Sequence, residues 1–387
     1  MTIRHAIAPA LLALAAAMPA AEPELKISPT LVIQTRADIN SGKSAGGADL
    51  TPGTEGAAAV EGDTVDFYLR RARLGAKVSY GALAGQMTVS ADNLARDGGK
   101  IGDANVKIYD AVSKYTFKGE SVSHEIRGGL YQAVFNPSAY SSSGWHLLPA
   151  SAATENLAAN RSVGVGYSLD SEMVDLSVDA QNTRTDGNNQ TDEGDGLWIS
   201  GRLTLSPAGE WNLSSWRESY AGAAGKDVAV GLEFATESDE TGAVTTDTTS
   251  YGIDVLVHLD GLSALVEYRA QTVDVEAGAE TDSTVLRVQA GYGFTLGNGT
   301  VIEPAARFQL IDLNTDDDEE PAEFSDATFG TPSFARDFGG SGTEIDLGAN
   351  WYISGNKNKV SALVTLWDAE DGEGEATIIR VQHQIVF

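Results

Sequence analysis

The chain has 387 residues, of which 42% are hydrophobic, and it contains 42 Gly, 11 Pro and no Cys. Without Cys it cannot form a disulfide framework, a thiolate metal site or a Cys nucleophile. The 55 acidic residues outnumber the 26 basic ones, which gives a net charge of −29. This excess argues against nucleic acid as a partner, because phosphate backbones need clustered Lys and Arg.

Residues 1–21 have the pattern of a secretory signal peptide. Arg4 and His5 form a short basic start, and an apolar stretch follows that ends in small residues. This stretch is about 12 residues long, which is too short for a helix that crosses a bilayer, since that takes roughly 20 residues. We therefore expect 1–21 to be removed on export and 22–387 to form a single domain.

The remaining chain is a near-regular series of segments in which apolar and polar residues alternate. Residues 197–205 (LWISGRLTL) place Leu, Ile and Gly on one face, and Trp, Ser, Arg and Thr on the other. This period of two indicates a strand whose faces lie in different environments. The span 208–226 is the least regular and fits a longer turn, a short helix or a misplaced strand. Sixteen segments follow the alternating pattern: 25–38, 64–79, 82–94, 104–117, 121–133, 161–169, 172–184, 195–207, 227–236, 246–259, 262–275, 282–295, 300–312, 342–353, 359–369 and 376–387.

Short turns and longer connections alternate between these segments. The short turns are rich in turn-forming residues and lie at 81, 118–120, 170–171, 260–261, 296–299 and 354–358. The main longer connections are polar or Gly-rich and lie at 39–63, 134–160, 237–245 and 313–341. Nothing in the architecture of a soluble sandwich requires short turns at one end and long loops at the other. Outer-membrane barrels have this arrangement, with short periplasmic turns and long external loops. The sequence therefore predicts an all-β fold, a transmembrane antiparallel β-barrel of about 16 strands, in the bacterial outer membrane.

The aromatic residues and the chain end agree with this prediction. Aromatic side chains near strand ends predict a girdle at the membrane interface, formed by Tyr80, Tyr115, Phe117, Trp351, Tyr352 and Trp367. The chain finishes within a strand on Phe387, with Ile385 and His383 on the same face. This arrangement is similar to the signal that the outer-membrane barrel insertion machinery reads.

Two stretches resemble the phosphate-selective porins, the O and P porin family. The first runs from Phe67 to Asn93 and contains the segment RRARLG, and the second runs from Pro304 to Leu366 and contains the segment GANWY. The resemblance implies a homotrimer of sixteen-stranded barrels, embedded in outer-membrane lipids and lipopolysaccharide. It also implies a third external loop that folds inward, here 134–160, and a path for small anions such as phosphate along lumenal Arg and Lys.

The candidate pore-lining residues of this anion pathway lie on the polar faces of the predicted strands: Arg71, Arg73, Lys77, Arg127, Arg202, Arg287, Arg307 and Arg380. A guanidinium suits the role because its planar fork binds phosphate oxygens in pairs and keeps its charge. The alternative is that these residues solvate a wet interior and pair with acidic residues, since Asp254, Glu267, Glu303 and Asp346 share that side.

Two features leave the ion preference open. The predicted constriction loop, 134–160, contains no Lys or Arg and a single acidic residue, Glu155, while relatives usually carry a Lys on the strand that enters this loop. The predicted external loops also carry acidic runs at 316–320 and 368–375. A general or cation-preferring porin is therefore the alternative to an anion-selective one.

The sequence carries no enzyme motif, so we expect a channel that is not an enzyme, with no catalytic residues, cofactor or metal. None of its five His residues forms an HExxH pair, and there is no GxSxG elbow or P-loop. An outer-membrane hydrolase would need an exposed Ser or Asp within reach of His124 or His258. A surface-exposed adhesive or structural barrel would need a lumen with no continuous wet path.

Overall fold

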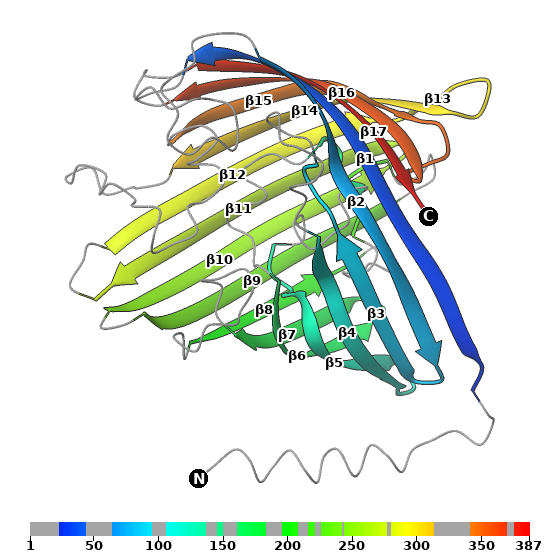
Figure 1. Ribbon diagram of the computed structural model, residues 1–387, viewed down its shortest axis with the longest axis vertical. Helices are drawn as coiled ribbons and strands as arrows, with labels where there is room; N and C mark the ends of the chain where they lie inside the picture. Colours follow the sequence, from blue (N-terminus) through cyan, green and yellow to red (C-terminus); the bar gives the residue numbers. More distant parts are fainter. Residues whose placement is uncertain are drawn as a thin grey trace.

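The computed structural model describes residues 23–43, 64–94, 106–136, 145–149, 161–182, 196–207, 216–220, 226–241, 244–276, 280–312, 341–369 and 375–387. These residues form one antiparallel β-sheet that closes into a barrel (Figure 1). Residues 1–21 lie outside this part of the chain, so the signal peptide stays a prediction.

The strands follow one another around the wall in chain order. They are β1 (Leu25–Lys43), β2 (Thr64–Tyr80), β3 (Leu83–Ser90), β4 (Lys107–Lys118), β5 (Val122–Gln132), β6 (Arg161–Ser171), β7 (Val174–Asn182), β8 (Leu197–Leu205), β9 (Lys226–Thr241), β10 (Val244–Leu259), β11 (Leu262–Val275), β12 (Glu280–Tyr292), β13 (Phe294–Thr295), β14 (Val301–Asp312), β15 (Gly342–Tyr352), β16 (Asn358–Ala369) and β17 (Glu375–Val386).

The barrel closes where the first and last strands meet. Strand β1 pairs with β2 on one side and with β17 on the other, in register from Val32 opposite Val386 to Lys43 opposite Glu375. The two-residue β13 continues β12 beyond Gly293 and pairs with the same neighbour, β14. The wall therefore has sixteen strands, as predicted, and no unpaired edge.

All sixteen predicted strands are present, with differences at their ends. The chain at 237–245, predicted as a longer connection, is mostly strand, because β9 and β10 continue to Thr241 and from Val244. Strand β3 ends at Ser90 and not at 94, because the chain then turns back toward β2, where Leu69 and Leu94 exchange backbone hydrogen bonds of 3.0 Å.

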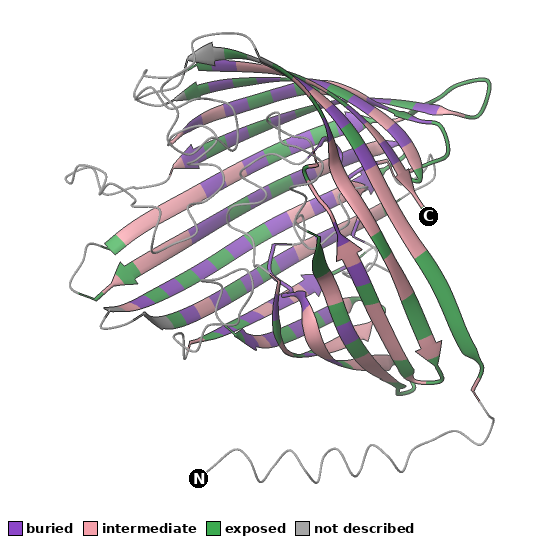
Figure 2. Ribbon diagram, viewed as in Figure 1, coloured by how far each residue is buried: buried purple, intermediate pink, exposed green. Residues whose placement is uncertain are grey.

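The two faces of the wall have opposite polarity. In β14 the exposed positions are apolar, as Ile302, Phe308 and Leu310 show, while the alternating buried positions include Glu303 and Arg307. Buried and exposed positions also alternate along much of β7 to β12, β15 and β16, whereas β2 to β5 are mostly of intermediate exposure (Figure 2). An apolar outer face and a polar inner face are the reverse of a soluble barrel and match a wall that faces lipid.

The predicted aromatic girdle is partly wrong. Tyr80, Phe117 and Trp351 are exposed on the outer face, but Tyr352 and Trp367 are buried inside the barrel. The reason is the period of the strand: Trp351 and Tyr352 are consecutive, so only one of them can face outward.

The connections lie at two ends of the barrel. We call one the turn end, because it carries the short turns that follow β2, β4, β6, β10, β13 and β15, and the other the loop end. The connection between β8 and β9 also lies at the turn end but spans residues 206–225. It thus differs in length from the other connections at that end.

Candidate functional site

The candidate site is the interior of the barrel, where charged side chains from many strands converge. In strand β8, Arg202 donates to Glu233 of β9 over 2.9 Å and to both carboxylate oxygens of Asp254 of β10 over 2.7 and 2.9 Å. Glu233 also accepts from Arg269 of β11 over 2.6 Å. One arginine therefore holds three neighbouring strands together on the inner face.

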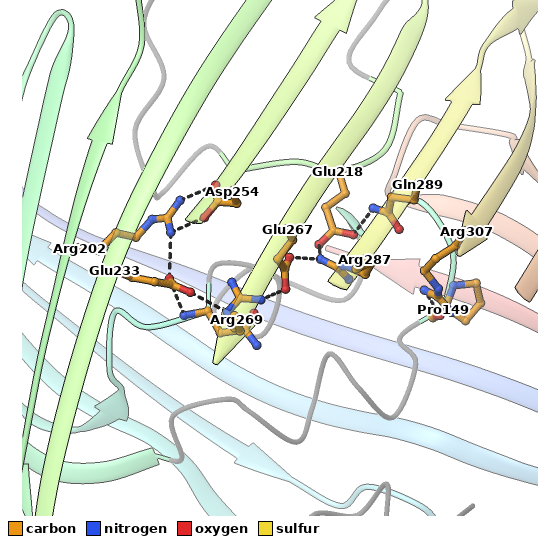
Figure 3. A network of polar contacts seen from close by, with 11 residues as sticks. Pro149, Arg202, Glu218, Glu233, Asp254, Glu267, Arg269, Arg287, Gln289 and Arg307 are labelled. Carbon is orange, nitrogen blue, oxygen red and sulfur yellow. Dashed lines mark hydrogen bonds and ion pairs between the residues drawn. The ribbon is translucent and has the colours of Figure 1, made fainter. Parts of the chain in front are cut away.

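The same network continues toward β12 (Figure 3). Glu267 forms ion pairs with both Arg269 and Arg287. Arg287 also lies 3.4 Å from Glu218, which accepts a hydrogen bond of 2.9 Å from Gln289. Each basic side chain of this network thus contacts at least one acidic one across β8 to β12 and residue 218, which lowers the cost of burying their charges.

A second group of contacts fixes the start of the chain that follows β5. Arg127 donates to Asp179 of β7 over 2.9 and 2.7 Å, and Tyr131 donates to the same oxygen over 3.0 Å. The other oxygen of Asp179 accepts from the backbone nitrogen of Val134 over 2.8 Å. Asp179 is 0% exposed, so it anchors residues 133–136 against the inner wall.

Residues 145–149 of the same connection lie against the opposite part of the wall. Arg307 of β14 pairs with Asp346 over 2.7 Å and donates to the carbonyl oxygen of Pro149 over 3.1 Å. Asn350 of β15 donates to the carbonyl oxygen of Leu147 over 2.5 Å. The described parts of 134–160 therefore lie inside the barrel, where the resemblance placed its third loop.

Among the described residues, three buried apolar clusters join inward segments to the wall. Phe135 packs edge-to-face on Trp198, with their ring centres 6.0 Å apart, beside Ala133 and Ala235. The other clusters are Leu147, Leu148 and Ala305, and Trp216, Ala229, Leu256 and Leu265. The apolar contacts therefore hold the inward segments 133–136, 145–149 and 216–220 in place.

The predicted residues of β2 also face inward, although the strand is irregular. Its pairing with β1 shifts by one residue at Arg70. Such a bulge moves the following side chains to the other face. The interior position before it is Tyr68, which is buried, and those after it are Arg71, Arg73 and Lys77.

Arg73 lies in a partly hydrated cluster. It donates to both oxygens of Asp92, and its guanidinium lies 3.6 Å from the ring centre of Tyr109. Burial by itself raises the pKa of Asp92, but the hydrogen bonds and charge of Arg73 outweigh this effect and hold the pKa below its usual value. Arg161 lies 3.4 Å from the same ring and pairs with Asp110 over 3.0 Å.

Water reaches the interior unevenly. Asp254, Arg287 and Asp346, on β10 to β15, are at most 1% exposed. The side chains of Arg73 and Asp92 are 13% and 16% exposed, and Lys77 is exposed. The hydrated part of the interior therefore runs along β2 to β4, and the inward segments cover the wall from β7 to β16.

All eight predicted pathway residues lie on the inner face, but most are engaged with acidic partners. Arg380 donates to Asp38 over 2.8 and 3.2 Å, and Lys77 has no ion pair with any residue that the structure describes. Sequence reasoning missed Arg36, which donates to Gln382 over 3.0 and 2.6 Å, and Arg269. Their alternating positions in β1 and β11 would have identified both by the rule that identified Arg287.

The remaining candidate groups do not converge on a reactive centre. His124, on the outer face, lies 2.7 Å from the hydroxyl of Tyr167 and stacks on Phe117, whereas His258 is buried inside. Within the described ranges, no group of three or more His, Asp and Glu residues could hold a metal ion. No helix in this part of the chain is long and apolar enough to cross a membrane.

Comparison with solved structures identifies the architecture. The anion-selective porin from Comamonas acidovorans matches 94% of this chain and 100% of its own, with a TM-score of 0.59 at 12% identity. The fold is that of the outer-membrane porins. OprB from Pseudomonas putida shares this porin fold, with a TM-score of 0.58 at 11% identity, over 93% of this chain and 94% of its own.

The trimer form of in-vitro folded OmpT, an outer membrane protein of Vibrio cholerae, is also similar. It has a TM-score of 0.52 at 12% identity and matches 94% of this chain and 99% of its own. No protein-family model and no curated protein matches the chain by sequence. At these identities the likeness establishes the porin fold.

Proposed function

We propose that the chain is an outer-membrane porin, a passive water-filled channel for small hydrophilic solutes. The observation that carries this proposal is the polarity of the wall: a closed barrel with an apolar outer face and a charged inner face. Such a wall is stable in a bilayer and surrounds a polar interior. The predicted export signal and the porin-like fold support a place in the bacterial outer membrane, among its lipids and lipopolysaccharide.

The channel prefers anions, with phosphate as one expected solute. Support comes from the charges along the hydrated wall, because the interior positions of β2 after the bulge are Arg71, Arg73, Gly75, Lys77 and Ser79. This stripe contains three basic residues and no acidic one, and Arg73 is paired with Asp92 beside it. Rings and stripes of fixed charge set selectivity in wide pores.

The buried arginines have a different role in this proposal. Arg202, Arg287 and Arg307 are at most 3% exposed and each pairs with acidic residues. A buried guanidinium whose charge is compensated by a carboxylate interacts only weakly with a permeating ion. These residues hold the wall and the inward segments, whereas the β2 stripe meets the solute.

The assembly and the family are also proposals. The RRARLG and GANWY segments resemble the phosphate-selective O and P porins, whose members are trimers. One structurally similar protein, OmpT of Vibrio cholerae, is described in a trimer form. We therefore propose a homotrimer that belongs to, or lies near, that family.

The alternatives are less well supported. A cation-preferring pore is favoured by the net charge of −29, but most acidic residues of the runs at 316–320 and 368–375 lie outside the described residues. A hydrolase requires an exposed nucleophile beside His124 or His258. The structure instead places the ring of His124 against Tyr167 and buries His258.

The proposal is tested by the reversal potential of the purified protein in a planar bilayer. Under a potassium chloride gradient, we expect a reversal potential of the sign set by chloride, and added inorganic phosphate should reduce the chloride current. A reversal potential set by potassium would replace the anion preference with a cation preference. Folded protein that carries no current would contradict the porin assignment itself.

A further inference from the structure

The connection between β8 and β9 enters the barrel from the turn end. Its described residues, 216–220, contact the inner faces of strands that are far from β8 in sequence. Trp216 packs on Ala229, Leu256 and Leu265, and it is 1% exposed. This segment is therefore part of the interior and not a surface turn.

The side chains of the segment differ in burial. Trp216 and Glu218 are buried against the wall, where Glu218 accepts from Gln289 over 2.9 Å and pairs with Arg287 over 3.4 Å. Arg217 lies between them in sequence and is only half-buried. Arg217, like Tyr220, keeps part of its surface exposed, whereas Trp216, Glu218 and Ser219 are buried.

The segment meets the connection that enters from the loop end. The backbone nitrogens of Glu218 and Ser219 each donate to the carbonyl oxygen of Trp145 over 3.0 Å. The guanidinium of Arg217 lies 5.1 Å from the centre of the Trp145 ring. Trp145 belongs to 134–160, so inward segments from opposite ends of the barrel join inside it.

Arg217 also differs from most of the other interior arginines in its charge partners. Arg202, Arg287, Arg307 and Arg380 each form an ion pair with a carboxylate. Within the described ranges, Arg217 forms no ion pair with any acidic side chain. Its charge is therefore not compensated by a direct partner among these residues.

We propose that the narrow part of the channel is built from both ends, by residues 145–149 and 216–220, and that Arg217 determines ion selectivity there. This inference rests on the proposed channel function. Trp216 and Glu218 fix the segment to the wall, the bonds to Trp145 join it to the other connection, and Arg217 presents its charge to permeating ions. The sequence did not predict this role, because 208–226 has no strand pattern.

The expected effect follows from Coulomb's law. A unit charge about 7 Å from an ion in water contributes roughly one RT, favourable for an anion and unfavourable for a cation, which changes the anion-to-cation permeability ratio about sevenfold. Arg217→Gln should therefore lower this ratio about sevenfold and Arg217→Glu about fiftyfold. Lys226→Glu is the matched control. Lys226 is the first residue of β9, at the turn end of the barrel, and its side chain is 68% exposed.

A second measurement uses the absence of Cys from the chain. In single channels of Arg217→Cys, a negatively charged methanethiosulfonate reagent should form a mixed disulfide with the thiol, releasing a sulfinate, and cause a step decrease in anion current. Lys226→Cys should show no such step. This measurement does not depend on the sign of the native selectivity.

The outcomes separate the two proposals. A wild-type protein that folds but carries no current would overturn the channel function, and this inference with it. A conducting wild type whose reversal potential is unchanged in Arg217→Glu, and whose Arg217→Cys current does not respond to the reagent, would overturn the role of Arg217 and leave the porin assignment intact.

Discussion

Asp179 is the residue whose loss should most clearly weaken the attachment between the wall and the inward segment that follows β5. It is fully buried and accepts from Arg127, from the hydroxyl of Tyr131 and from the backbone nitrogen of Val134. In Asp179→Ala, the guanidinium of Arg127 retains its 2.7 Å hydrogen bond to the hydroxyl of Ser168 but loses the ion pair with its closest carboxylate. Removing one partner of a buried ion pair costs about 3–5 kcal/mol.

The assay is a urea titration of the protein folded in lipid vesicles, followed by Trp fluorescence and by the heat-dependent gel shift of a folded barrel. We expect Asp179→Ala to lower the free energy of unfolding by about 3–5 kcal/mol, and Asp179→Asn, which keeps an acceptor, by about 1–3 kcal/mol. Glu24→Ala is the control, because the exposed pair of Glu24 and Lys26, 3.8 Å apart, should contribute less than about 1 kcal/mol. A loss below about 1 kcal/mol in Asp179→Ala would refute the anchoring role.

Three further predictions concern the outer face, the hydrated wall and the inward segment. Phe308→Arg should destabilise the barrel by about 2–4 kcal/mol in vesicle titrations, and Ile302→Arg, nearer the turn end, by about 1 kcal/mol or less; equal costs would contradict the membrane-facing assignment of β14. Lys77→Glu should move the reversal potential toward that of a cation-selective pore, while Lys226→Glu should not, and identical shifts would remove the β2 stripe from the pathway. Trp216→Ala should raise single-channel conductance and current noise, because the segment loses its apolar anchor; an unchanged conductance would show that 216–220 does not narrow the pore.

The wall of the barrel could be predicted from the sequence because it depends on a local pattern, the alternation of apolar and polar residues along each strand. In β8, β12 and β17 the alternation of residue types assigned the inner and outer faces correctly, for instance Arg287 inside and Val288 outside. When the two faces of a strand lie in different environments, the alternation of apolar and polar residues can be recognised from the strand's own sequence, without knowledge of distant residues. The same rule could have found Arg36 and Arg269.

The contents of the barrel could not be predicted because they depend on contacts between distant residues. The ion pair between Arg307 and Asp346, and the bond from Arg307 to Pro149, join residues that no local pattern connects. The segment 216–220 has no periodic signal, and its position follows from the apolar pocket that receives Trp216. The bulge at Arg70 has no clear sequence signal either, and only the pairing with β1 locates it.

The distinction between compensated and hydrated charge also required the structure. The sequence grouped Arg202 and Lys77 as members of one pathway, since both lie on polar faces. In the folded chain Arg202 is buried and bonded to Glu233 and Asp254, while Lys77 is exposed to the interior solvent. Burial and pairing decide which charges an ion can meet, and neither follows from residue type alone.

Single-channel recording of the purified, folded protein in a planar bilayer is the direct test of whether the folded barrel is an open channel. We expect discrete conductance steps grouped in threes, with a reversal potential set by the anion and a current that inorganic phosphate reduces. Protein that inserts, shows the heat-dependent gel shift of a folded barrel and yet carries no steps would contradict it.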